Sequence, residues 1–386
     1  MSKLSRVACL AVLALVMTAS HAFASAASDA YKQAKKMATA VDRAASDEER
    51  AAKETELHDW AKTKASALLG QNLGRMDIAY VGRMQSAAGL YDDAITTLEK
   101  AIGDPRKSKY ESYMYLFYVR ALIGAEQHDK AFAVFQKMSV DYGAEKNAKI
   151  AAMSMGLAMR AKRRWKESAV ALDFSLKMKN AAALKPLVNS LLLDGQKDAA
   201  IKAIEYAIEK AGEKGADEAH PILMAITKKW GETLPLEFVD FAPGPAPDIE
   251  GKVVVMGFWN VSAGTLRWTM GTLQGLFDMF PPTAGVETLA VTTYYKKNPD
   301  TGKIEEAMTP EEEHAHGLAY RETLGFRGQL AYVKDREALK ALGVSAFPCI
   351  TIVGKDGKLL YSHTVNRNDP TEIAVIQDII KNAAAK

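Results

Sequence analysis

A repeated segment constrains the first half of this chain more than any other feature. Related segments begin at Tyr91 (YDDAITTLEKAI), His128 (HDKAFAVFQKM) and Trp165 (WKESAVALDFSL), so successive copies are 37 residues apart. A fourth copy, DAAIKAIEYAI, follows after a shorter step of 32 residues. Each copy has a small residue one helical turn before a large apolar one: Ala94 and Leu98, Ala131 and Phe135, Ser168 and Leu172, Ala200 and Ile204. One such pair of helices cannot bury its own apolar face, so the repeat predicts helix pairs that stack into a solenoid.

The composition around the repeats also favours helices. From Ser28 to about Gly231 the chain is rich in Ala, Leu, Met and Lys, has few prolines, and carries apolar residues at intervals of three and four. We expect residues 28–74 to form one or two charged helices that cap the array. The repeats themselves are expected to fill residues 75–231.

A proline-rich stretch ends the helical pattern. The segment LPLEFVDFAPGPAPDIEGK contains four prolines between Leu234 and Lys252, and three of them, spaced by single residues, cannot lie inside a helix. We therefore predict a domain boundary near Gly231 and a linker with domain entry at residues 232–250. Beyond it, short apolar strands alternate with helical segments, which predicts an α/β domain with a mixed sheet at residues 251–386.

The first 24 residues have the pattern of a signal peptide. Lys3 and Arg6 precede the apolar run VACLAVLALVMTA, and small residues follow at AFA-S. This run is short for a membrane span, and no later segment is long and apolar enough to cross a membrane. We expect an exported, soluble protein, periplasmic in a Gram-negative bacterium or secreted. Lys3 and Arg6 account for two of the three formal positive charges, so no broad basic field for nucleic acid is expected.

The cysteine count limits the redox chemistry of the chain. Cys9 and Cys349 are the only two cysteines, and removal of the leader leaves Cys349 alone. An exported protein with one cysteine has no internal disulfide, so its stability must come from packing.

Two segments of the second half resemble the thioredoxin-like fold, in its branch of exported thiol-disulfide oxidoreductases and redoxins. GKVVVMGFWNVSAGTLR is similar to the opening of that fold, with Phe258, Trp259 and Arg267 matching. LGVSAFPCITIVGKDGKLL is similar to its second signature, in which Pro348 takes the position of the cis-proline. In the same way, the repeats resemble the tetratricopeptide repeat family, since Gly82 and Gly156 stand where that family has a small residue.

The resemblance also shows what this chain lacks. The two cysteines of the family's active-site loop are replaced, because the loop reads Ala263, Gly264, Thr265 and Leu266. Gly257 stands where thioredoxins proper carry a buried acid. Dithiol exchange needs an attacking thiolate and a resolving thiol one turn later, so we expect no ordinary dithiol activity.

The remaining thiol leaves two hypotheses open. Cys349 directly follows Pro348, so the resemblance implies that it lies near the vacant loop. It is either a one-cysteine redox centre, as in a redoxin-type oxidoreductase or peroxidase, or a small buried apolar residue between core positions.

A histidine pair gives a third and weaker hypothesis. His314 and His316 follow three glutamates, and histidines with carboxylates can bind a transition metal. Residues two apart point to different faces of a helix, however, and Thr309 followed by Pro310 and acidic residues is typical of a helix start. We therefore favour a solvated helix start and expect no metal and no cofactor.

The sequence thus predicts an N-terminal all-α, tetratricopeptide-like solenoid joined to a C-terminal α/β thioredoxin-like domain. The favoured function is that of a protein-interaction or scaffold protein with a redox-inactive domain. Its partners would be proteins or peptides, bound by the helical repeats and by an apolar groove at Trp259, Phe347 and Pro348. The alternative is an enzyme that acts through Cys349.

Overall fold

The computed structural model describes residues 26–105, 108–211, 219–260, 266–294, 308–344, 346–365 and 370–386. The predicted signal peptide at residues 1–24 lies outside the described residues. The chain divides into two compact units. The first, here called the helical unit, comprises Met1–Met159 and Val170–Ala183, and the second, the sheet unit, comprises Arg160–Ala169 and Leu184–Lys386.

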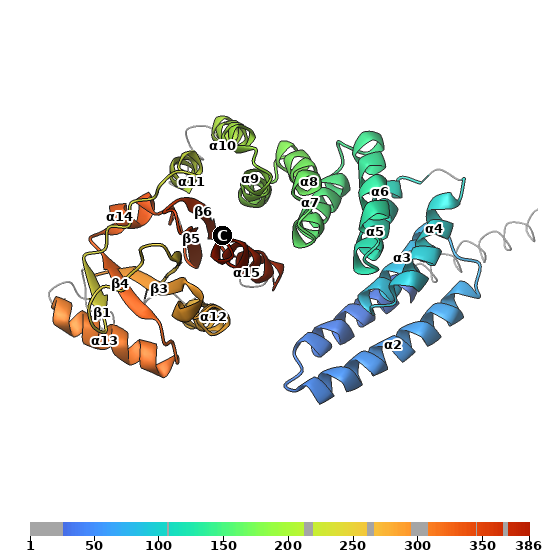
Figure 1. Cartoon of the computed structure of the whole chain (residues 1–386). Helices are drawn as coiled ribbons and strands as arrows, with labels where there is room; N and C mark the ends of the chain where they lie inside the picture. The colour runs from blue at the N-terminus through green and yellow to red at the C-terminus, as the bar shows by residue number, and fades with distance from the viewer. Residues whose placement is uncertain are drawn as a thin grey trace, which may run out of the picture. The chain divides into compact units, whose positions relative to one another are not determined.

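The first half of the chain is helical, as predicted (Figure 1). Helices α4, α6 and α8 begin at Tyr91, His128 and Trp165, the residues at which the repeated segments begin. The helices are residues 26–42, α2 (Asp47–Leu69), α3 (Arg75–Ala87), α4 (Tyr91–Gly103), α5 (Glu111–Gly124), α6 (His128–Asp141), α7 (Lys146–Ala161), α8 (Trp165–Lys177), η1 (Ala181–Ala183), α9 (Leu184–Leu193), α10 (Lys197–Ala211) and α11 (Ala219–Lys228).

The backbone repeats with the same period as the sequence. The residue two positions before α4, α6, α8 and α10 has a positive φ in every copy: 76° at Gly89, 59° at Glu126, 58° at Arg163 and 75° at Gly195. In the first, second and fourth copies the next residue donates its N–H to a carbonyl five positions earlier, at 2.8 to 2.9 Å. This is the left-handed turn that commonly ends a helix. The repeating element is therefore a helix, a fixed turn and a second helix.

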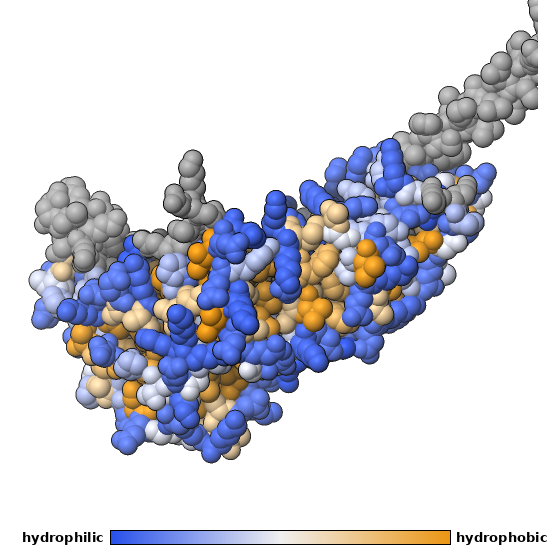
Figure 2. All heavy atoms as spheres, turned by 90° about the horizontal axis from the view of Figure 1, so that it is seen from above, coloured by the Kyte–Doolittle hydropathy of each residue, from blue (hydrophilic) through white to orange (hydrophobic). Residues whose placement is uncertain are grey.

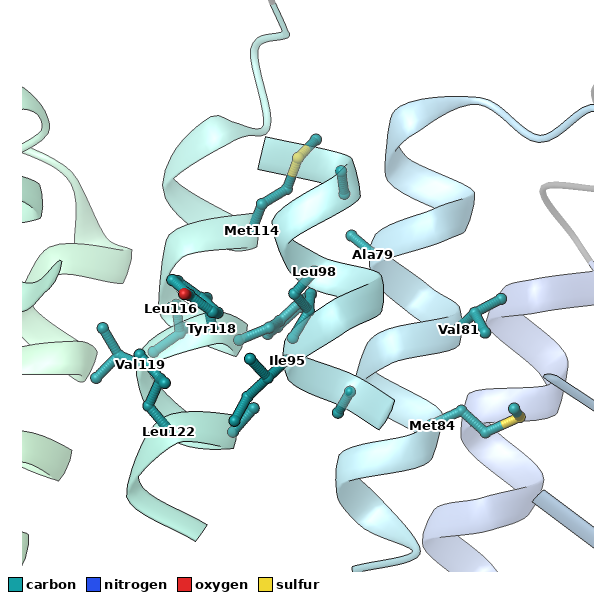
Figure 3. Packing of buried hydrophobic residues seen from close by; sticks show 14 of the residues in the cluster. Ala79, Val81, Met84, Ile95, Leu98, Met114, Leu116, Tyr118, Val119 and Leu122 are labelled. Carbon is teal, nitrogen blue, oxygen red and sulfur yellow. The ribbon is translucent and has the colours of Figure 1, made fainter. Parts of the chain in front are cut away.

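Two glycines allow close approach of the paired helices. A Cβ on Gly82 would lie 2.7 Å from Cγ of Leu98, and a Cβ on Gly156 would lie 2.5 Å from Cγ of Leu172. Both leucines are fully buried. The small position in the first helix and the large position in the second therefore fit together, as the sequence pattern predicts. Figure 3 shows Leu98 in the interior formed by α3, α4 and α5.

The second half forms the predicted mixed sheet, whose six strands run in the order β1-β4-β3-β2-β5-β6. Strands β2, β3 and β4 are parallel, and the other pairs are antiparallel. The elements are β1 (Asp240–Ala242), β2 (Val253–Phe258), α12 (Leu266–Met279), η2 (Pro282–Ala284), β3 (Val286–Thr293), α13 (Pro310–Thr323), β4 (Gln329–Val333), α14 (Arg336–Ala341), β5 (Cys349–Val353), β6 (Leu359–Thr364) and α15 (Pro370–Ala384).

Helices cover both faces of the sheet. Apolar residues of α12, α13 and α15 pack on one face, and those of α11 and α14 pack on the other. All six residues of β2 are buried, because this strand lies inside the sheet with helices on each side. A β–α–β crossover, a closing antiparallel hairpin and a final helix make this half a thioredoxin-like fold, which confirms the predicted fold class.

The proline-rich segment is built into the sheet. Asp240–Ala242 form the edge strand β1, which pairs antiparallel with β4. Earlier in the segment, Leu234 donates its N–H to the carbonyl of Gly357 at 3.0 Å. Helices α9 to α11 belong to the same compact unit as the sheet. The predicted domain boundary near Gly231 stays a prediction.

Polar and charged side chains cover most of the face seen in Figure 2, with smaller apolar areas between them. Among the described residues, no helix combines the length and the apolar character needed to cross a membrane.

Candidate functional site

The candidate site lies where the end of β2 meets the start of β5. Phe258 and Cys349 are opposite one another in the antiparallel pairing of these strands. The peptide bond between Phe347 and Pro348 is cis, as the resemblance implied. The carbonyl of Pro348 accepts a hydrogen bond from the N–H of Val365 at 2.8 Å, which fixes the segment that enters β5. The segment before β5 is thus held against the ends of the central strands.

A cavity of about 340 Å³ adjoins this segment. Its wall includes Asn260 after β2, Thr293 at the end of β3 and the partly exposed Phe347. Arg336 and Lys340 of α14 add two basic side chains. Pockets that bind small groups are typically concave, largely apolar and equipped with a few polar groups, and this cavity has that character.

Cys349 faces the core instead of the cavity. Its side chain is fully buried and belongs to the apolar cluster between the sheet and helices α11 and α14. Burial raises the pKa of the Cys349 thiol to about 12, although the hydroxyl of Ser362 and the positive charge of Lys185 oppose this rise. A thiol with this pKa is protonated at neutral pH, whereas the thiolate is the form that acts as a nucleophile. Of the two hypotheses for Cys349, the geometry favours the buried apolar residue.

The degenerate active-site loop is described only at its end. Ala263, Gly264 and Thr265 lie outside the described residues. Leu266 is the first residue of α12, is 9% exposed and packs in the core. It therefore stands at the start of the helix as the resemblance implied, with an apolar side chain in place of a thiol.

Gly257 explains why the buried acid of thioredoxins is missing here. A Cβ on Gly257 would lie 2.6 Å from Cδ2 of Leu273. Leu273 of α12 is fully buried on β2. The space for a side chain at this position is filled by leucine, so no proton-transfer group can occupy it.

Trp259 lies in the core, which corrects its place in the expected partner-binding groove. Its side chain is 1% exposed and packs in the cluster that includes Leu330 and Tyr332. The backbone N–H of Trp259 donates to the carbonyl of Val291 at 3.0 Å, which continues the pairing of β2 with β3. Pro348 is buried as well. Of the three predicted groove residues, Phe347 therefore has the one partly exposed side chain.

The two histidines occupy the helix start that the sequence favoured. Thr309 caps α13 in a capping box with Glu312. His314 packs on Tyr332, with ring centroids 4.6 Å apart, and His316 packs edge-on against Tyr320 at 4.9 Å. The described residues hold no group of three or more His, Cys, Asp or Glu side chains arranged to bind a metal ion.

His314 also belongs to a polar cluster that the sequence did not predict. Its Nε2 lies 3.3 Å from Oδ2 of Asp240 and 3.2 Å from the hydroxyl of Tyr294. The Tyr294 hydroxyl donates to Asp240 at 2.9 Å. Asp240 stands on the edge strand β1, far from the other two in sequence, so no local pattern joins the three.

A second unpredicted cluster lies beneath β6. Nη2 of Arg160 donates to Oε1 of Glu372 at 2.8 Å, and the Tyr361 hydroxyl donates to the same oxygen at 3.2 Å. Nε2 of His363 lies 3.5 Å from that oxygen. All four side chains are buried. Burial lowers the pKa of His363 to about 4, against the attraction of Glu372.

No family model and no curated protein matches this chain. Among solved structures, it is similar to a thiol-disulfide isomerase from Corynebacterium glutamicum, at 15% identity and a TM-score of 0.32, over 40% of this chain and 97% of the other. A thiol:disulfide interchange protein of the thioredoxin family from Chlorobium tepidum TLS gives 12% identity and a TM-score of 0.26, over 36% and 83%. An uncharacterized thioredoxin-like protein from Porphyromonas gingivalis gives 16% identity and a TM-score of 0.26, over 34% and 76%. The fold assignment rests on the strand order and connections described above.

Proposed function

We propose that this chain is an exported, non-catalytic polypeptide-binding protein, in which a thioredoxin-like domain has kept the groove of its fold and lost the redox chemistry. The observation that carries this proposal is the state of Cys349. The thiol is fully buried and its pKa is raised to about 12, although it directly follows the cis-proline. With alanine and leucine at the two cysteine positions, no thiolate is available to attack a disulfide.

The groove beside the cis-proline is suited to an extended polypeptide. An extended peptide can bind beside the cis-proline through main-chain hydrogen bonds, and pockets for its side chains supply specificity. The cavity next to Phe347 has a volume of about 340 Å³, enough for one or two side chains of a partner. Arg336 and Lys340 lie in its wall, and Lys340 also pairs with Glu337 at 3.0 Å.

The helical repeats provide a second surface in this proposal. The period of the turn residues, together with the contacts Gly82–Leu98 and Gly156–Leu172, supports assignment to the tetratricopeptide-like class. Such arrays bind peptides and proteins along the faces of stacked helices. The signal-peptide pattern supports export, with the periplasm as the favoured compartment. A scaffold that joins two partners is the function that fits both surfaces.

Binding of an unfolded polypeptide tests the proposal directly. The probe is a fluorescent, reduced and alkylated polypeptide, and its anisotropy is followed with the wild-type chain, with Phe347→Ala and with Val239→Ala. Phe347→Ala is expected to weaken binding about tenfold, because partly buried aromatic residues dominate such contacts. Val239, 53% exposed on the same unit and outside the cavity wall, is the control and should leave binding unchanged.

A parallel assay measures reduction of insulin by dithiothreitol. We expect the wild-type chain to leave the rate unchanged. Acceleration that is lost in Cys349→Ser would overturn the proposal and establish a redoxin-type enzyme. Equal binding of the probe by wild type and Phe347→Ala would show that the polypeptide does not bind at the groove beside the cis-proline.

A further inference from the structure

Two arginines occupy the same position in successive repeats of the helical unit. Arg83 lies on α3 and Arg120 on α5, 37 residues apart, which is the repeat period. Arg83 directly follows Gly82, and Arg120 follows Val119, which is the equivalent residue of the next copy. Helices α3 and α5 are in contact. The repeat therefore brings two positive charges to one face of neighbouring helices.

Aromatic rings hold Arg83 in place. Its guanidinium carbon lies 3.9 Å from the ring centroid of Tyr31 and 4.5 Å from that of Phe117. Phe117 packs edge-on against Tyr113, which is 41% exposed. Stacking uses the flat faces of a guanidinium and leaves its N–H edge for hydrogen bonds, which suits bidentate recognition of a carboxylate.

Among the described side chains, the two arginines have no acidic counterpart. Elsewhere in the helical unit, Arg75 pairs with Glu111 and Lys130 pairs with Glu99. In the part of the chain that the structure describes, no carboxylate lies within ion-pair distance of Arg83 or Arg120. Nε of Arg120 donates a long hydrogen bond of 3.4 Å to Oγ of Ser154.

The surroundings of Arg120 disfavour its positive charge. Desolvation by the surrounding protein lowers the pKa of Arg120, and the positive charge of Arg83 lowers it further. Arg120 is exposed, so solvent screens part of the repulsion between these two like charges. An anionic ligand would supply the missing counter-charge to both groups.

We propose that Arg83 and Arg120 form a binding site for an acidic polypeptide segment, with one carboxylate on each guanidinium and the exposed ring of Tyr113 beside them. This inference deepens the proposed function and rests on it, since it takes the helical array as a partner-binding surface. An acidic polypeptide is favoured over nucleic acid because the formal charge of the whole chain is only +3, so two arginines are not part of a wide basic field.

The test uses a fluorescein-labelled dodecapeptide of alternating Gly and Glu, together with the same peptide carrying Gln in place of Glu. Anisotropy titrations compare wild type, R83Q, R120Q, the double variant and R50Q. Arg50 is exposed on α2 of the same unit, so R50Q is a control with the same change of charge. The double variant and the Gln peptide are each expected to raise the dissociation constant at least about tenfold, since two charge-assisted contacts are lost. R50Q should leave it within about twofold.

Equal affinity of wild type and the double variant for the Glu peptide would overturn the inference. So would equal affinity for the Glu and Gln peptides, or tighter binding of a single-stranded DNA dodecamer than of the Glu peptide. The reduced and alkylated polypeptide probe of the first binding assay separates the two proposals. If that probe binds and the Glu peptide does not, only this inference fails; if neither binds, the proposed function fails as well.

A stability measurement gives an independent check. In the absence of ligand, R120Q should raise the thermal midpoint by about 2 °C, because it removes the repulsion from Arg83. A lowered midpoint would mean that Arg120 supports the fold, and the assignment to a ligand site would be wrong.

Discussion

The buried ion pair between Arg160 and Glu372 should be essential to the stability of the sheet unit. Both side chains are 2% exposed, and their charged atoms are 2.8 Å apart. The same carboxylate oxygen accepts a hydrogen bond from Tyr361 and lies near His363. Glu372→Gln keeps the shape of this group and one acceptor oxygen while it removes the negative charge. The substitution therefore leaves a buried guanidinium without its counter-charge.

The expected loss in the free energy of unfolding is about 3 to 5 kcal/mol, the range found when one partner of a buried pair is removed. No discount for solvent screening applies, because both groups are almost fully buried. Removal of both charges, in Arg160→Met with Glu372→Gln, should cost less than the sum of the single losses. The difference is expected to be about 2 kcal/mol, because the double variant leaves no unpaired charge.

Urea unfolding followed by tryptophan fluorescence measures these losses. Trp165, Trp230, Trp259 and Trp268 belong to the sheet unit, whereas Trp60 belongs to the helical unit. Asp378→Asn is the control, since Asp378 pairs with Arg163, whose side chain is 57% exposed, and its loss should stay below about 1 kcal/mol. A loss below about 1 kcal/mol for Glu372→Gln would mean that the buried ion pair does not stabilise the sheet unit.

Two further predictions concern packing and pH. Gly156→Ala should lower the free energy of unfolding by about 1 to 3 kcal/mol, because its Cβ would meet Leu172 at 2.5 Å; Gly103→Ala, which has open space, is the control in thermal unfolding and should not destabilise. His363 has an ordinary pKa of 6.5 when unfolded and about 4 when folded, so the unfolded chain takes up the proton first as the pH falls. Its contribution to stability is complete above pH 6.5 and is lost progressively towards pH 4, by about 2 kcal/mol between pH 6.5 and 5. Replacement by Asn should flatten this slope in urea titrations, and an unchanged slope would assign it to other groups.

The repeat and the fold class could be predicted because their signals are periodic or local. Small and large residues at fixed positions predicted the helix pairs, and α4, α6 and α8 begin where the repeated segments begin. The cis-proline at Pro348 was implied by one short segment. Features of this kind depend on residues that are neighbours in the sequence, so they can be predicted from the amino-acid order.

Other features depend on contacts between distant residues. Arg160 and Glu372 are 212 residues apart, and no local sequence pattern predicts their pairing. β1 has three residues within a proline-rich segment, too few for an alternating pattern, and it is defined by its partner β4. Trp259 was expected in a groove, but its side chain is buried in a cluster with Leu330 and Tyr332, which are distant from it in the sequence.

Reaction of Cys349 with a maleimide shows whether the thioredoxin-like domain retains a reactive thiol. The measurement uses the full chain with Cys9→Ser, so that Cys349 alone reports, across pH 6 to 10, folded and in urea. We predict almost no reaction in the folded protein and ordinary reaction after unfolding, because the thiol is fully buried and its pKa is raised to about 12. Fast reaction of the folded protein, with a midpoint below the free-cysteine value of about 8.5, would establish an activated thiolate and contradict the account of a binding protein without redox activity.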